Sequence, residues 1–102
     1  MENDQARLRI QVYVCRNCNA VLGNSLFAAQ HDCNKVILLT EVEGPLMSTS
    51  KKTSPEAMDR GCVYHTLQCG ECQHEVGKYY SSVTNKFEVL DKKYALCIKE
   101  IK

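Results

Sequence analysis

Two C-x-x-C pairs constrain the fold of this chain more than any other feature. They are Cys15-Arg16-Asn17-Cys18 and Cys69-Gly70-Glu71-Cys72. This spacing lets two thiolates turn inward on one tight loop, and a structural zinc site takes four such ligands in a tetrahedron. We therefore predict one structural Zn²⁺ per chain, with the ligands Cys15, Cys18, Cys69 and Cys72. The alternatives are disulfides or a thioredoxin-type redox pair, but the redox pair needs a βαβ context that the sequence does not show.

The two pairs also lie in similar sequence. Leu22-Gly23 follows Cys18 at the same distance as Val76-Gly77 follows Cys72. A weak internal repeat of this kind predicts two hairpins, each with a cysteine loop at its tip, that close on one ion. We interpret the two glycines as backbone positions that need room behind these loops.

Length, charge and cysteine content narrow the class of protein. A chain of 102 residues is one domain, residues 1–102, with a core at about 8–98. The start is polar and no stretch is long and apolar enough for a membrane, so we expect reduced thiols in the cytosol or nucleus. The remaining cysteines, Cys33, Cys62 and Cys97, are interpreted as small buried hydrophobes. A net charge of +1 predicts weak direct binding to DNA.

Apolar patterning predicts a mainly β fold. The expected strands are 8–14, 21–23, 35–40, 62–68, 75–80 and 94–98, and the run at 35–40 is predicted to be central or buried on both faces. Residues 25–29 are strand or coil, 31–34 a turn, and 87–90 a turn or short strand. The architecture is then two small antiparallel sheets, pinched together at one end by the zinc.

Two polar segments complete this organisation. Residues 43–61 are predicted to be a long solvated loop, in which Ser54-Pro55 is a minimal phosphorylation pattern. An amphipathic charged pattern begins at 99–102, and we expect a helix to follow it in a longer protein. Tyr79 and Tyr80 are expected to be available for protein contacts.

Nothing in the sequence pairs a nucleophile with a base. Four thiolates would close the zinc shell, whereas a catalytic zinc keeps an open position. Deaminase and H-E-x-x-H patterns are both missing. His74 lies two residues after Cys72 and could replace a ligand, although a solvent-facing position beside the loop is the simpler interpretation. We expect a protein that is not an enzyme.

The whole motif set resembles a known family, the Yippee-like domain of the Mis-eighteen kinetochore proteins. The similar residues are Val14-Cys15-x-x-Cys18-x-x-x-Leu22-Gly23-Asn24-Ser25, then Gly61-Cys62-Val63-x-x-x-Leu67-x-Cys69-x-x-Cys72-x-x-x-Val76-Gly77-x-x-Tyr80, and the ending Leu90-Asp91-x-Lys93-x-x-x-Cys97. The resemblance implies a zinc-bound β-tent with the four cysteine ligands given above. It also implies homo- or hetero-oligomers in the nucleus, on chromosomes at centromeres, that license deposition of the histone variant CENP-A through its chaperone in the cell cycle.

Related β-tent proteins supply the alternatives. Cereblon-type domains bind cyclic imides in a tryptophan cage, and this chain has no tryptophan. A plain Yippee protein would be a generic scaffold or ubiquitin-ligase subunit. A reductase like methionine sulfoxide reductase B would need a reactive cysteine, for which Cys97 is the candidate if it lines an open cleft beside a histidine.

Overall fold

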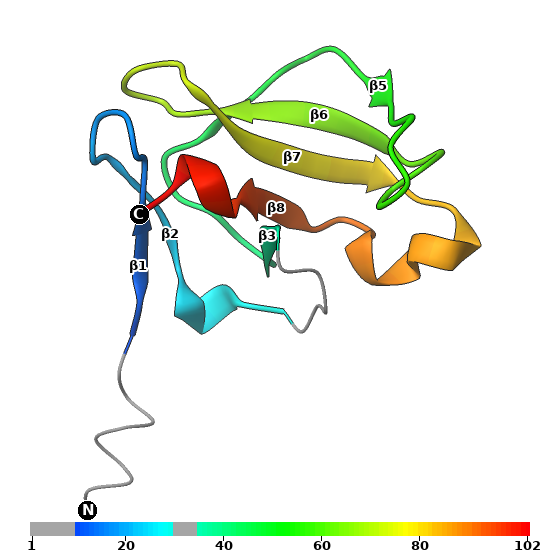
Figure 1. Ribbon diagram of the computed structural model, residues 1–102, viewed down its shortest axis with the longest axis horizontal. Helices are drawn as coiled ribbons and strands as arrows, with labels where there is room; N and C mark the ends of the chain where they lie inside the picture. The colour runs from blue at the N-terminus through cyan, green and yellow to red at the C-terminus, as the bar shows by residue number, and fades with distance from the viewer. Residues whose placement is uncertain (1–9, 30–34) are drawn as a thin grey trace, which may run out of the picture.

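Two antiparallel sheets make up the computed structural model, which describes residues 10–29 and 35–102 (Figure 1). The small sheet pairs β1 (Val12–Val14) with β2 (Val21–Asn24). The large sheet has the order β3-β8-β7-β6-β4, and β5 also pairs with β6. Its strands are β3 (Val36–Leu39), β4 (Leu46–Met47), β5 (Lys52–Thr53), β6 (Val63–Gln68), β7 (Glu75–Ser82) and β8 (Tyr94–Cys97). The predicted mainly β fold with two antiparallel sheets is confirmed, although the second sheet is six-stranded rather than small.

In the described part of the chain, three short 3₁₀ helices connect or end the strands: η1 (Ser25–Phe27), η2 (Asn85–Leu90) and η3 (Ile98–Glu100). The structure therefore has helical turns where strand, turn or coil was predicted at 25–29 and 87–90. No helix of the described residues is long and apolar enough to cross a membrane. The predicted turn at 31–34, together with Cys33 and residues 8 and 9, lies outside the described residues.

The main core lies between the two sheets. Leu22 from the small sheet packs with Leu67, Val76 and Leu96 from the large sheet, and all four side chains are buried. Ile101 belongs to the same cluster and forms a bridge to Cys15, so the last residues also close this core. A second cluster lies on the opposite side of the large sheet and contains Leu38, Cys62, Tyr80, Leu90 and Ala95. Cys62 is fully buried, as predicted.

The strand at 36–39 is an edge strand, so the prediction of a central position is wrong. β3 pairs with β8 on one side, and on its other side the described residues make only the bridge between Ala28 and Leu39 with its flanking backbone hydrogen bonds. The other predicted alternative, burial on both faces, explains its apolar run. Leu39 packs into the main core while its neighbour Leu38 packs into the second one, so the end of β3 is buried on both faces.

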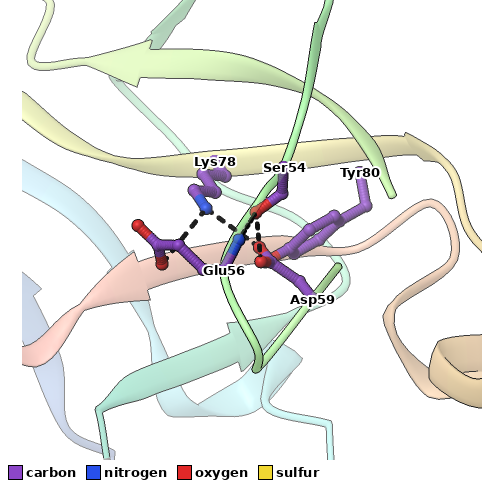
Figure 2. Close-up of polar contacts among 5 residues, drawn as sticks. All are labelled: Ser54, Glu56, Asp59, Lys78 and Tyr80. Carbon is purple, nitrogen blue, oxygen red and sulfur yellow. Dashed lines mark hydrogen bonds and ion pairs between the residues drawn. The ribbon is translucent and has the colours of Figure 1, made fainter. Parts of the chain in front are cut away.

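The prediction of a solvated loop at 43–61 is correct only in part, because most of these residues are exposed but the segment also contains strands and buried side chains. Residues 46–61, which we call the strap, form β4 and β5 along β6 and bury two polar side chains, Ser54 and Asp59. Asp59 accepts hydrogen bonds from Ser54 Oγ, from Tyr80 Oη at 2.6 Å and from Lys78 Nζ at 2.9 Å (Figure 2). Because Ser54 is only 2% exposed, the hydroxyl of the Ser54-Pro55 pattern does not face solvent.

Candidate metal centre

The two C-x-x-C loops, called knuckles below, have the same backbone structure. In the first, the N–H of Asn19 donates to Cys15 O at 2.8 Å, and the N–H of Cys15 donates to Ala20 O at 2.8 Å. The second knuckle has both hydrogen bonds at the equivalent residues: the N–H of Gln73 donates to Cys69 O at 2.9 Å, and the N–H of Cys69 donates to His74 O at 2.8 Å.

Backbone angles and burial follow the same repeat. Asn19 and Gln73 both have positive φ, 68° and 62°, and this conformation turns the backbone of each knuckle back after its second cysteine. Behind the knuckles, a Cβ on Gly77 would lie 2.1 Å from Ala95 O, and one on Gly23 would lie 2.9 Å from Leu39 Cδ1. The repeat and the need for room at both glycines are therefore confirmed.

The four knuckle cysteines meet at one end of the two sheets. The sulfur atoms of Cys15, Cys18, Cys69 and Cys72 all lie within 4.8 Å of one another. The Sγ–Sγ distance is 3.7 Å for Cys15 and Cys72, and 3.5 Å for Cys18 and Cys69. Four thiolates around a tetrahedral zinc at about 2.3 Å would lie about 3.8 Å apart. These separations are much longer than the roughly 2.05 Å of a disulfide. The arrangement fits a four-thiolate zinc ion.

Hydrogen bonds and neighbouring thiols move the pKa values of Cys72 and Cys18 in opposite directions. A hydrogen bond from Asn17, followed by one from the His74 backbone, lowers the pKa of Cys72 to about 6. The Ala20 backbone acts to lower the pKa of Cys18, but desolvation and the other thiols outweigh it and raise that pKa to about 12. A divalent cation needs four thiolates, so its binding would release the remaining protons.

The C-terminal turn braces both knuckles. Arg16 Nε donates to Lys99 O at 2.9 Å, and the backbone N–H of Arg16 donates to the backbone carbonyl of Glu100 at 3.0 Å. On the other knuckle, His74 Nε2 lies 2.6 Å from Glu100 Oε1. The hydrogen bond to Glu100 raises the pKa of His74, and His74 in turn lowers the pKa of Glu100.

The structure thus places His74 against Glu100 rather than among the four sulfur atoms, with 41% of its side chain exposed, as the solvent-facing interpretation predicts. The bracing roles of Arg16 and Glu100 were not predicted from sequence. Their partners are the other knuckle and the chain end, and no local pattern links such distant segments.

A mainly β domain, whose two sheets meet at a four-thiol centre, defines a small metal-knuckle domain of the Yippee-like class. The chain belongs to the Yippee–Mis18 family. The family model described as "Yippee zinc-binding/DNA-binding /Mis18, centromere assembly" matches residues 11–102. This confirms the family to which the motifs were similar.

Individual relatives agree with this assignment. Human Protein Mis18-alpha is 28% identical over 98 residues, which cover 94% of this chain and 42% of that protein. Mis18-alpha of Plecturocebus moloch is 30% identical over 77 residues, covering 74% of this chain and 33% of that protein. The crystal structure of a Mis18 "Yippee-like" domain superposes with a TM-score of 0.82 at 20% identity, covering 92% of this chain and 94% of that one. The chain therefore spans less than half the length of these curated relatives and nearly all of the solved domain.

Proposed function

We propose that this chain is a non-catalytic, zinc-bound, oligomerising adaptor of centromere assembly. It would work in the nucleus, at centromeres, and help license deposition of CENP-A through its chaperone. The observation that carries the proposal is the family match over residues 11–102, whose description names both zinc binding and centromere assembly. The Mis18-alpha relatives support the same process.

The chemistry of the centre supports a structural metal. Four sulfur donors fill a tetrahedral zinc shell, so the ion would offer no open position to a substrate. Cys97, the candidate nucleophile of a reductase, is half-buried in β8, and burial raises the pKa of its thiol. A protonated thiol is a poor nucleophile. This argues against the reductase alternative.

Surface charge supports a protein partner. The net charge of +1 gives little long-range attraction to a polyanion, so we expect direct DNA binding to be weak. Tyr80 does not contribute to such a surface, contrary to the prediction, because it is only 1% exposed and lies in the second core cluster. The exposed apolar side chains of the strap are the better candidates, with Leu46 at 56% and Met47 at 42% exposure.

Self-association is supported by a depression of about 510 Å³ between β1 and the C-terminal turn, which is lined by five largely apolar residues together with Gln11, Arg16 and Lys102. Val12, Tyr13, Ile37, Ile98 and Ile101 supply its apolar lining. Val12 is 52% and Ile98 39% exposed in the single chain, and a second subunit would cover both. We propose this face as the oligomer contact.

A negative charge on this face should therefore weaken association. Val12→Glu or Ile98→Glu would place a carboxylate in the apolar contact, at a cost of roughly 2–3 kcal/mol, or about a 30- to 150-fold higher Kd. Sedimentation across a concentration series measures this. Val89→Glu is the matched control, because Val89 is 49% exposed but lies on η2, outside the depression. A wild-type chain that remains an 11.5 kDa monomer, or unchanged association in both variants, would contradict the proposal.

The centromere role can be tested by separation of function in cells. The protein is depleted and replaced by its full-length form carrying Leu46→Asp and Met47→Asp on the strap surface. We expect zinc content and fold to be retained, while centromeric CENP-A falls several-fold. Thr49→Asp is the matched control, since it adds charge at an exposed polar position of the same strap. If depletion of the whole protein leaves centromeric CENP-A unchanged, a generic Yippee-type scaffold or ubiquitin-ligase subunit is the better assignment.

A further inference from the structure

A basic depression lies beside η2, at one end of the large sheet. Figure 1 shows that the knuckles lie at the other end. Its volume is about 320 Å³, and it is lined by Ala57, Arg60, Thr84, Lys86 and Phe87. Two segments distant in sequence build it, the turn that ends the strap and the loop that leads from β7 into η2. They approach closely at Gly61, where φ is +86° and a Cβ would lie 3.1 Å from Thr84 Cγ2. The shape therefore depends on the fold and is absent from either segment alone.

The two cations of this depression are not used to hold the fold together. Neither Arg60 nor Lys86 forms an ion pair within residues 10–29 and 35–102. Lys86 Nζ lies 6.0 Å from the ring centroid of Phe87, and the hydroxyl of Thr84 makes no capping hydrogen bond to η2. By contrast, the nearby Lys78 pairs with Asp59. The depression thus offers two unpaired cations, a free hydroxyl and one aromatic ring.

We propose that this depression binds the phosphate group of a phosphorylated serine or threonine in a partner protein. A phosphomonoester carries about −1.5 to −2 charges at neutral pH, which matches one guanidinium and one ammonium. Arg60 can donate two parallel hydrogen bonds to phosphate oxygens, and Lys86 adds a point charge. The Phe87 ring supplies an apolar surface for the carbon atoms of the peptide that carries the phosphate.

A nucleic acid fits the same surface less well. A duplex presents a row of phosphates and needs a row of cations, whereas this depression provides two. Acidic side chains also flank it. Glu56 precedes Ala57 and has 62% of its side chain exposed, and Glu88 is exposed on η2. Neither carboxylate is a lining residue of the depression, so both would oppose a polyanion that extends beyond it more than a single phosphate group within it.

The proposal can be tested with the isolated zinc-loaded chain, independently of any role at centromeres. The probe is the pentapeptide Gly-Gly-phosphoserine-Gly-Gly, titrated while amide ¹⁵N–¹H spectra are recorded. We expect saturable shifts at Arg60, Thr84 and Lys86, and none with the unphosphorylated peptide. Arg60→Gln or Lys86→Gln should each weaken binding about tenfold, the usual effect of losing one charge-assisted hydrogen bond. Lys99→Gln is the matched control, because it removes the same charge from exposed η3 and should leave binding unchanged.

Two further probes separate the sources of phosphate. Inorganic phosphate that binds as tightly as the phosphopeptide would indicate an adventitious ion only and would overturn the peptide assignment. A mixed-sequence DNA duplex that shifts the same amides, when the phosphopeptide does not, would overturn it in favour of nucleic acid. Absence of saturable shifts, or equal weakening by Lys99→Gln, would overturn the site itself.

Discussion

A Cys69→Ser chain is expected to contain no zinc and to be unfolded at room temperature. Cys69 is fully buried, and its sulfur lies 3.5 Å from that of Cys18 in the four-thiol centre. The apparent binding free energy of a structural zinc in such a site is roughly 10–16 kcal/mol. This is as large as the whole free energy of unfolding of a typical domain, about 5–15 kcal/mol. Serine cannot replace the thiolate ligand, so most of this contribution would be lost. Metal analysis and far-ultraviolet circular dichroism measure the two outcomes.

Cys97→Ser provides the control for this experiment. Cys97 is half-buried in β8 and lies outside the four-thiol centre, so we expect a folded protein with one zinc per chain. A chelator added to the wild-type chain should unfold it to the same state as Cys69→Ser. A folded Cys69→Ser chain, or a wild-type chain purified without zinc, would show that the centre is not the structural metal site we propose.

The knuckles were predictable from sequence because their geometry is local. In a C-x-x-C loop, the spacing alone brings the two sulfur atoms to one side, and the aliphatic-glycine pair after it marks the return strand. The repeat then predicted that Val76 and Leu22 would be equivalent, and both are fully buried. Most strands of the two sheets were predictable for the same reason, since alternation of apolar residues is a local pattern.

The two buried polar side chains of the strap were not predictable, because their burial depends on residues distant in sequence. Ser54 and Asp59 are polar and lie among small or charged residues, which is the composition of a solvated loop. Ser54 donates to Asp59, and the other two partners of Asp59, Lys78 and Tyr80, lie on β7, about twenty residues further along the chain. No periodicity within the strap reveals such a pairing. The same limit explains why Tyr80 was expected at the surface, since its hydroxyl is satisfied only by the buried carboxylate.

Replacing Asp59 should have the second largest effect on stability. Its carboxylate is fully buried and joins the strap to β7 through Lys78 and Tyr80 (Figure 2). Burial acts to raise the pKa of Asp59, but the hydrogen bonds from Ser54, Tyr80 and Lys78 outweigh it and lower the pKa below 3.8. Burial, followed by the hydrogen bond to Asp59, raises the pKa of Tyr80, so the phenol remains a donor. Asp59 is therefore a paired, ionised carboxylate at neutral pH.

Asp59→Ala would leave the Lys78 ammonium without its nearest partner and the hydroxyl of Tyr80 buried without an acceptor. Loss of one partner from a buried ion pair costs about 3–5 kcal/mol. We expect the zinc-loaded variant to lose about this much in the free energy of unfolding, measured with denaturant. Glu56→Ala is the matched control: Glu56 lies 4.0 Å from the same Lys78, but 62% of its side chain is exposed. An exposed pair of this kind contributes less than about 1 kcal/mol.

The pH dependence of the Asp59→Ala effect follows from the lowered pKa of Asp59. A folded-state pKa below the unfolded value of 3.8 means that ionised Asp59 stabilises the fold above that pH. Its contribution is lost only as the pH falls through the lower, folded-state pKa. The difference between wild type and Asp59→Ala should therefore be the same at about pH 6 and about pH 8, where Asp59 is ionised in both states. A cost below about 1 kcal/mol would mean that the strap is held by its β4 and β5 pairings and not by this carboxylate. A cost that changes steeply across this range would contradict a carboxylate that is ionised in both states.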